Sequence, residues 1–123
     1  MRFLTYIESD PAQGPPPPAL FEALGAFGAE IATLGVVVDR GGLAPVDSST
    51  HIRVGGGAMT ILDGPFAEAK EVIGGYAMYD VRSEEEVLEW ARRFMQIHVD
   101  TWPEFEGTAV IRQVFDAPGV EVS

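Results

Sequence analysis

The sequence lacks cysteine and has a single lysine and only two histidines among its 123 residues. Without cysteine, the chain can form no disulfide bond, thiol nucleophile or cysteine-ligated metal site. The two histidines do not form an H-x-x-x-H pattern, so we expect neither a catalytic metal nor another cofactor. Long apolar runs are also missing, and no segment approaches the roughly 20 residues that a membrane-spanning helix needs.

Positive charge is scarce throughout the chain. Eight lysine and arginine residues stand against 19 acidic ones, which gives a formal net charge of -11. Nucleic acids and anionic membranes attract positive surfaces, so we expect neither as a partner. The apolar start of the chain, MRFLTYIES, is too short for a signal-peptide core, which favours a cytoplasmic location. A length of 123 residues with 46% hydrophobic residues predicts one folded domain over 1–123.

The first third of the chain predicts a strand followed by a helix. Residues 2–8 are β-branched or aromatic on both alternating faces, which is typical of a strand covered on both sides. The proline-rich segment 9–18 predicts a stiff approach to a helix over 19–34. That helix has an apolar stripe at alternating spacings of four and three, namely Leu20, Leu24, Phe27, Ile31 and Leu34.

The middle of the chain predicts short strands and a hairpin. Residues 36–39 form a strand, and 40–45 (RGGLAP) form a turn and loop. Residues 50–54 and 58–62 flank three consecutive glycines, which indicates a β-hairpin.

The last third predicts a strand, a helix and a strand. Residues 75–82 are a strand, and Ser83 with Glu86 three positions later forms a capping box at the start of a helix. Within that helix Glu89 and Arg93 are spaced to pair. Residues 108–115 form the closing strand.

The resulting order, β-α-β, hairpin, β-α-β, predicts an α+β fold of the ferredoxin-like sandwich type. Two helices can cover only one face of the sheet, whereas the strands are apolar on both faces. A second copy of the chain is the simplest cover for the open face. We therefore expect a homodimer in which two sheets pack face to face as a dimeric α/β barrel.

The most informative stretch is DGPFAEAKE at 63–71, followed by GGY at 74–76. It resembles the signature of the DGPF-domain branch of the YCII-related superfamily. The similarity continues into DVRSEEEVLEWARRF and into AVIRQVF with its central Arg112. The resemblance implies a bacterial, cytoplasmic protein with a dimeric α/β-barrel fold.

The resemblance also implies two kinds of function. The wider superfamily is suspected of acid–base chemistry through a His–Asp pair whose histidine lies on the first helix. Residues 19–34 contain no histidine, so that pair does not transfer to this chain. Genes of the DGPF branch are associated with alternative sigma factors, which suggests a regulatory or accessory role.

Four candidate site residues lie in the motif region. Asp63 precedes Gly-Pro, so it is either a turn-capping carboxylate or a general base. Lys70, the only lysine, either forms a structural ion pair or binds an acidic ligand. Neighbouring acids, Glu68 among them, favour its charged form. Tyr76 offers a hydroxyl to a ligand.

Four further candidates lie outside the motif. His98 falls in register with the apolar side of the second helix, where it is either a half-buried structural residue or an acid–base group. His51 and Arg53 share one face of the hairpin. Arg112, in the middle of the last strand, either bridges two subunits or clamps an anion.

These residues predict a protein that binds a small polar or anionic metabolite, with possible cofactor-free acid–base catalysis. In that hypothesis Asp63 is the base or an orienting group, and Lys70 and Arg112 supply positive charge. The alternative is a non-enzymatic accessory module that acts through protein contacts. A cofactor-free oxygenase or isomerase is a third hypothesis, which rests on fold analogy alone.

Overall fold

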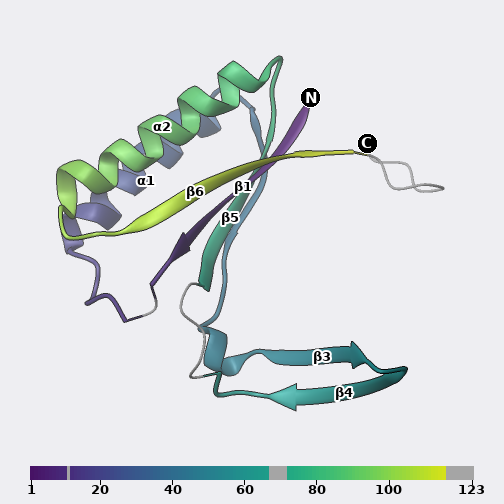
Figure 1. The fold of residues 1–123 in the computed structure, drawn as a ribbon. Coiled ribbons are helices and arrows are strands. Elements are labelled where there is room, and N and C mark those ends of the chain that lie inside the picture. The colour runs from purple at the N-terminus through teal and green to yellow at the C-terminus, as the bar shows by residue number, and fades with distance from the viewer. Residues whose placement is uncertain (11, 67–71, 116–123) are drawn as a thin grey trace.

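A computed structural model describes residues 1–10, 12–66 and 72–115. Within them the chain forms two sheets and two long helices (Figure 1). The strands are β1 (Arg2–Ser9), β2 (Val37–Gly42), β3 (Thr50–Gly55), β4 (Ala58–Asp63), β5 (Val72–Asp80) and β6 (Gly107–Val114). The helices are α1 (Pro18–Ala32), α2 (Glu84–Thr101) and the short 3-10 helix η1 (Val46–Ser48).

The main sheet is antiparallel, with the strand order β2-β5-β1-β6. Both long helices lie on the same side of this sheet, so the protein has two layers (Figure 1). The predicted α+β architecture, an antiparallel sheet with two helices, is therefore confirmed.

The core lies between the sheet and the helices. Because side chains alternate along a strand, Phe3, Tyr79 and Ile111 point to the helix side of three neighbouring strands. They meet Phe27 and Ile31 of α1 there. The best-buried side chain is Val87 at the start of α2, with 0% exposure, which is what its place on the predicted apolar side of this helix requires.

Both helices begin where local sequence signals predict. Pro18 is the first residue of α1, a position that proline suits because its missing N–H has no helical partner to lose. The Ser83 hydroxyl accepts a hydrogen bond from the backbone N–H of Glu86 at 3.2 Å, so Ser83 caps α2 as expected. None of the described helices combines the length and the apolar character needed to cross a bilayer.

An ion pair joins the two helices where the sequence suggested a pair within α2. Arg93 donates two hydrogen bonds to the carboxylate of Glu30, at 2.6 and 2.9 Å, rather than pairing with Glu89. Instead, Oε2 of Glu89 lies 4.0 Å from Nε of Arg92. A two-pronged guanidinium–carboxylate contact is geometrically better than a single contact along one helix, which explains the preference.

The strand β2 is longer than the sequence suggested, so the predicted loop over 40–45 is wrong for residues 40–42. It continues to Gly42, because Arg40 pairs with Ala77 and Gly41 pairs with Tyr76 on β5. Arg40 is therefore a strand residue on the helix side of the sheet and not part of a loop.

The predicted hairpin forms a separate two-stranded sheet from β3 and β4, and it extends away from the two layers (Figure 1). Gly56 and Gly57 form its turn with φ angles of +58° and +76°, a left-handed conformation that favours glycine. Every residue of both strands is exposed.

Candidate functional site

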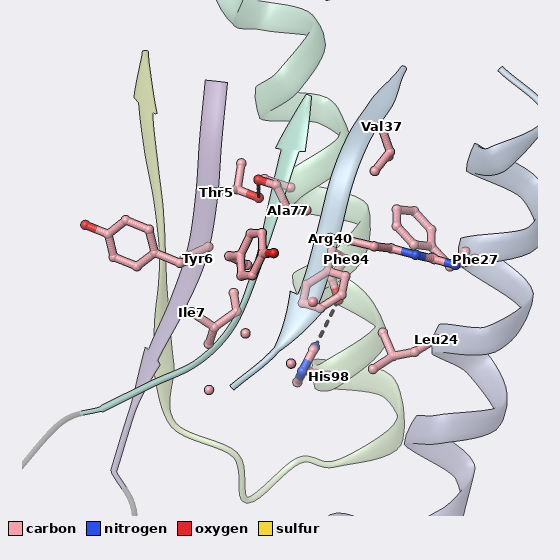
Figure 2. Close-up of a pocket in the computed structure, with 18 of the residues that line it drawn as sticks. Thr5, Tyr6, Ile7, Leu24, Phe27, Val37, Arg40, Ala77, Phe94 and His98 are labelled. Atoms are coloured by element: carbon pink, nitrogen blue, oxygen red, sulfur yellow. Dashed lines mark hydrogen bonds between the residues drawn. The ribbon is translucent and has the colours of Figure 1, made fainter. Parts of the chain in front are cut away.

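A cavity of about 680 Å³ lies between the helix side of the main sheet and the two helices. Figure 2 shows the arrangement: Thr5 and Ile7 come from β1, Arg40 from β2, Leu24 and Phe27 from α1, and Phe94 and His98 from α2. Most of the lining is apolar, and a few polar groups converge on it, as in small-molecule sites generally. The polar groups that matter below are those of Arg40, Tyr79 and His98.

Arg40 supplies positive charge to the cavity. Its side chain crosses from β2 to α1, where Gly28 leaves the space that it needs (Figure 2). A Cβ atom built on Gly28 would lie 2.6 Å from Nη1 of Arg40, so the glycine permits a close approach. Among the described residues, the guanidinium has no hydrogen-bond or ion-pair partner. A cation that lines a cavity in this way is available to an anion.

Tyr79 places a hydroxyl on the same cavity. Its side chain belongs to the core and is only 4% exposed. Burial raises the pKa of the phenol, and the nearby Arg40 cation acts in the opposite direction. Within the described part of the chain the hydroxyl has no hydrogen-bond partner, yet no fully buried side-chain oxygen or nitrogen is left unpaired there. The hydroxyl therefore opens onto the cavity, where it can donate a hydrogen bond to a ligand.

His98 lies at the α2 wall with a defined ring orientation. It is 7% exposed, and its Nδ1 lies 3.0 Å from the backbone carbonyl oxygen of Phe94 (Figure 2). A carbonyl oxygen can only accept, so Nδ1 carries the proton. In the neutral ring Nε2 then has the lone pair, which makes it a proton acceptor. The rings of Phe94 and Phe105 pack beside the imidazole, with centroids 5.0 and 4.7 Å from its own.

Two predicted site residues, Tyr76 and Arg112, have their side chains on the face of the main sheet opposite the helices, because they pair with Tyr6 and Leu4 of β1. Tyr76 borders the cavity, and its hydroxyl donates to Oδ2 of Asp39 at 3.3 Å. The Asp39 charge raises the pKa of Tyr76. Arg112 is exposed on that face.

Three predicted site residues lie on the hairpin. Asp63 ends β4, and its Oδ1 accepts a hydrogen bond from the Thr50 hydroxyl at 3.1 Å. The His51 ring stacks on Phe66 with a centroid distance of 3.5 Å. Arg53 is exposed two residues further along β3. None of these three lines the cavity.

The last two predicted site residues, Glu68 and Lys70, lie outside the described residues. In the part of the chain that the structure does describe, no three histidine or acidic side chains are grouped as a metal ion would require.

Sequence reasoning missed Arg40, Tyr79 and Gly28 as site residues. Arg40 was placed in a loop, because the glycines that follow it usually end a strand. One signal could have identified it: an arginine that directly follows the apolar run VVVD and precedes two glycines. In the sequence, Gly28 is recognisable only as a small residue beside an apolar stripe. Its close approach to Arg40 exists only in the folded chain.

The arrangement defines a class of protein: a two-layer α+β domain with a largely apolar, partly charged cavity between its layers. The family model of the YCII-related domain matches residues 1–106, and the chain belongs to that family.

Two individual likenesses accompany the family match. A 50-residue stretch is 38% identical to an uncharacterised protein of Rhizobium meliloti (strain 1021), and it covers 41% of this chain and 40% of that relative's length. Among solved structures, 5-chloro-2-hydroxyhydroquinone dehydrochlorinase (TftG) from Burkholderia phenoliruptrix AC1100, in complex with 2,5-dihydroxybenzoquinone, is 14% identical. The TM-score is 0.46, and the alignment covers 98% of this chain and 100% of the other.

Proposed function

We propose that the protein binds a small anionic metabolite in the cavity between its sheet and its helices. The observation that supports this most directly is the Arg40 guanidinium, which lines the cavity with no carboxylate within 4.0 Å among residues 1–10, 12–66 and 72–115. A chain with a net charge of -11 has many acidic side chains that could neutralise an arginine. An arginine kept apart from them is suited to an anion from outside.

The same cavity is suited to cofactor-free acid–base chemistry. The neutral tautomer of His98 has Nε2 as its proton acceptor, and Tyr79 presents a hydroxyl as a donor. Of the catalytic candidates within the described residues, Asp63 and His98, only His98 lines the cavity. We therefore assign it the role of general base and assign Arg40 the role of anion anchor. Asp63 and Lys70 stay as predictions for a second polar site at the motif.

Replacement of Arg40 by methionine tests the proposal, because methionine keeps much of the length and loses the charge. Backbone amide NMR signals of cavity residues should shift when sodium benzoate is added to the wild type, and the Arg40→Met variant should lose those shifts. Arg92→Met is the matched control, since Arg92 is an exposed arginine of α2 away from the cavity. Equal responses from both variants would contradict the proposal.

We further propose that the protein is a cytoplasmic homodimer of the DGPF type, with ferredoxin-like protomers that pair through the open face of the main sheet. Side chains at Leu4, Tyr6, Met78 and Val110 lie on that face and are only partly exposed. A second sheet would cover them and form a dimeric barrel. Light scattering that gives a monomer at micromolar concentration would contradict the dimer.

A second candidate function, an accessory module that acts through protein contacts, is favoured by one feature of the hairpin. The register places the pairs Ile52–Ile61 and Val54–Met59 on one face, and each of the four side chains is 64–73% exposed. A continuous exposed apolar face of this kind is typical of interaction surfaces. The two functions are compatible, because the hairpin extends away from the two layers (Figure 1) and none of its residues lines the cavity.

A further inference from the structure

The cavity has a shape and a charge that specify more than a small anion. We infer, on the basis of the proposed function, that its ligand is an aromatic carboxylate: a flat ring that carries one carboxylate group.

The charge of the cavity fits a single negative group. Among the described residues that line it, Arg40 is the only lysine or arginine, and none carries a carboxylate side chain. The planar guanidinium matches a carboxylate through two parallel hydrogen bonds. Tyr79 and Arg40 both line the cavity, so the Tyr79 hydroxyl can donate a further hydrogen bond to a bound ligand. Among the described lining residues, a second negative group would find no arginine or lysine of its own.

The wall on the helix side is made largely of aromatic rings. Phe27 and Phe94 meet edge to face with centroids 6.1 Å apart, and the row continues through His98 to Phe105. Aromatic rings pack on one another in offset or edge-to-face geometry and so favour a ring in the ligand over a flexible chain. The row also contains the proton acceptor, so a ring held here would lie beside Nε2 of His98.

Part of the sheet side of the cavity is bare backbone, because glycines line it beside side chains such as those of Thr5 and Ala77. Gly41, Gly42, Gly74 and Gly75 line the cavity where β2 pairs with β5. A Cβ atom built on Gly42 or Gly74 would meet no atom within 4 Å, so open space lies beside the backbone at both positions. Aromatic rings on the helix side and open space beside Gly42 and Gly74 leave room for a planar ring.

Isothermal titration calorimetry with three probes tests the inference. The first is 1-naphthoate, which has both ring and carboxylate. The second, 1-naphthalenemethanol, keeps the ring without charge, and the third, pyruvate, keeps the charge without a ring. We expect 1-naphthoate to bind at least tenfold more tightly than either of the others. In Arg40→Met the affinity for 1-naphthoate should fall at least tenfold, while that for 1-naphthalenemethanol should change less than twofold.

Each other outcome overturns a defined part of the argument. If pyruvate binds as tightly as 1-naphthoate, the aromatic ligand is wrong and the anion site stands. If 1-naphthalenemethanol binds as tightly as 1-naphthoate and Arg40→Met changes nothing, the proposed anion site is wrong, and so is the carboxylate group of the inferred ligand. Failure of all three probes to bind overturns both. Should Arg40→Met fail to fold, Tyr79→Phe provides the second variant, because it removes only a hydroxyl and should lower the 1-naphthoate affinity several-fold.

Discussion

The cavity and the hairpin differ in opposite directions from the usual placement of polar and apolar side chains. Around the cavity, polar groups such as those of Tyr79 and His98 are buried among apolar side chains, with 4% and 7% exposure. On the hairpin, apolar side chains such as Ile52 and Val54 are 64% and 73% exposed. Each region departs from the usual rule that apolar groups are inside and polar groups are outside.

The difference supports the two proposed functions at separate places, with ligand binding at the cavity and protein contacts at the hairpin. The polar groups that open onto the cavity can still form hydrogen bonds with a ligand. Exposed apolar strands in a two-stranded sheet have little stability of their own in water, so their presence points to a surface that meets another surface. The predictions that follow test this division, from the largest expected effect to the smallest.

The same substitution at two isoleucines should have very different effects on stability. Ile31 is 2% exposed in the core beside the cavity, and Ile61 is 64% exposed on the hairpin. Ile31→Ala should lower the free energy of unfolding by about 2–5 kcal/mol, because it leaves a cavity in packed surroundings. Ile61→Ala should change it by about 0.5 kcal/mol or less. Urea unfolding measures both, and a large effect at Ile61 would mean that the hairpin is covered in solution.

A substitution in the turn of the hairpin should destabilise the hairpin without changing the structure of the cavity. Gly57 has a φ of +76°, and an alanine in this left-handed conformation costs about 1–2 kcal/mol. Gly57→Ala should therefore weaken the hairpin locally, and backbone amide NMR signals should shift over residues 50–63 only. Gly55→Ala is the matched control, because Gly55 has no positive φ and a Cβ there meets nothing within 4 Å. Shifts at Arg40 or His98 would show that the two regions are coupled.

The sequence predicted the elements of the fold better than the ends of its strands. The cap at Ser83, the proline start of α1 and the glycine turn of the hairpin are local signals, and the structure has all three. The end of β2 was placed too early, because pairing with β5 extends the strand through Gly41 and Gly42. Pairing of this kind depends on a partner strand some 35 residues away, which no local pattern reveals.

The candidate site was harder to predict than the fold for a related reason. Sequence reasoning weighed residues that stand out by type, and it thereby reached His98, which does line the cavity. It missed Arg40 because the importance of that residue arises from the space at Gly28 and from the distance to other charges. It also favoured Asp63, His51 and Arg53, which the chain places on the hairpin. Their proposed roles remain predictions.

Two glycines of α1 should separate an effect on binding from an effect on stability. A Cβ atom at Gly28 would lie 2.6 Å from Nη1 of Arg40, whereas one at Gly25 would meet nothing within 4 Å. Both Gly→Ala variants should stabilise the helix by up to about 1 kcal/mol, since alanine is the better helix former. At Gly28 the displaced guanidinium should offset part of this increase and should weaken 1-naphthoate binding several-fold. Equal affinities in the two variants would show that the position of Arg40 is unimportant for the anion.

The smallest expected effect concerns the ion pair between Glu30 of α1 and Arg93 of α2, the two helices that line the cavity. Among the described residues, the hairpin has no ion pair of this kind. The hydrogen bonds from Arg93 lower the pKa of Glu30, and the charge of Arg93 acts in the same direction. A carboxyl group with a lowered pKa in the folded state stabilises the protein above the pKa of the unfolded chain, and this contribution disappears as the pH falls through the lowered value.

Glu30→Gln should therefore be less stable than the wild type near neutral pH and should lose less stability on acidification. The difference should be small and should shrink in high salt, because the Glu30 and Arg93 side chains are 53% and 40% exposed. Urea midpoints measured across the acid range for Glu30→Gln, with Glu22→Gln on the same helix as control, give the comparison. If Glu30→Gln follows the wild type at every pH, the pair adds nothing to the cavity's walls. Packing around Phe27 and Val87 then holds the helices together alone.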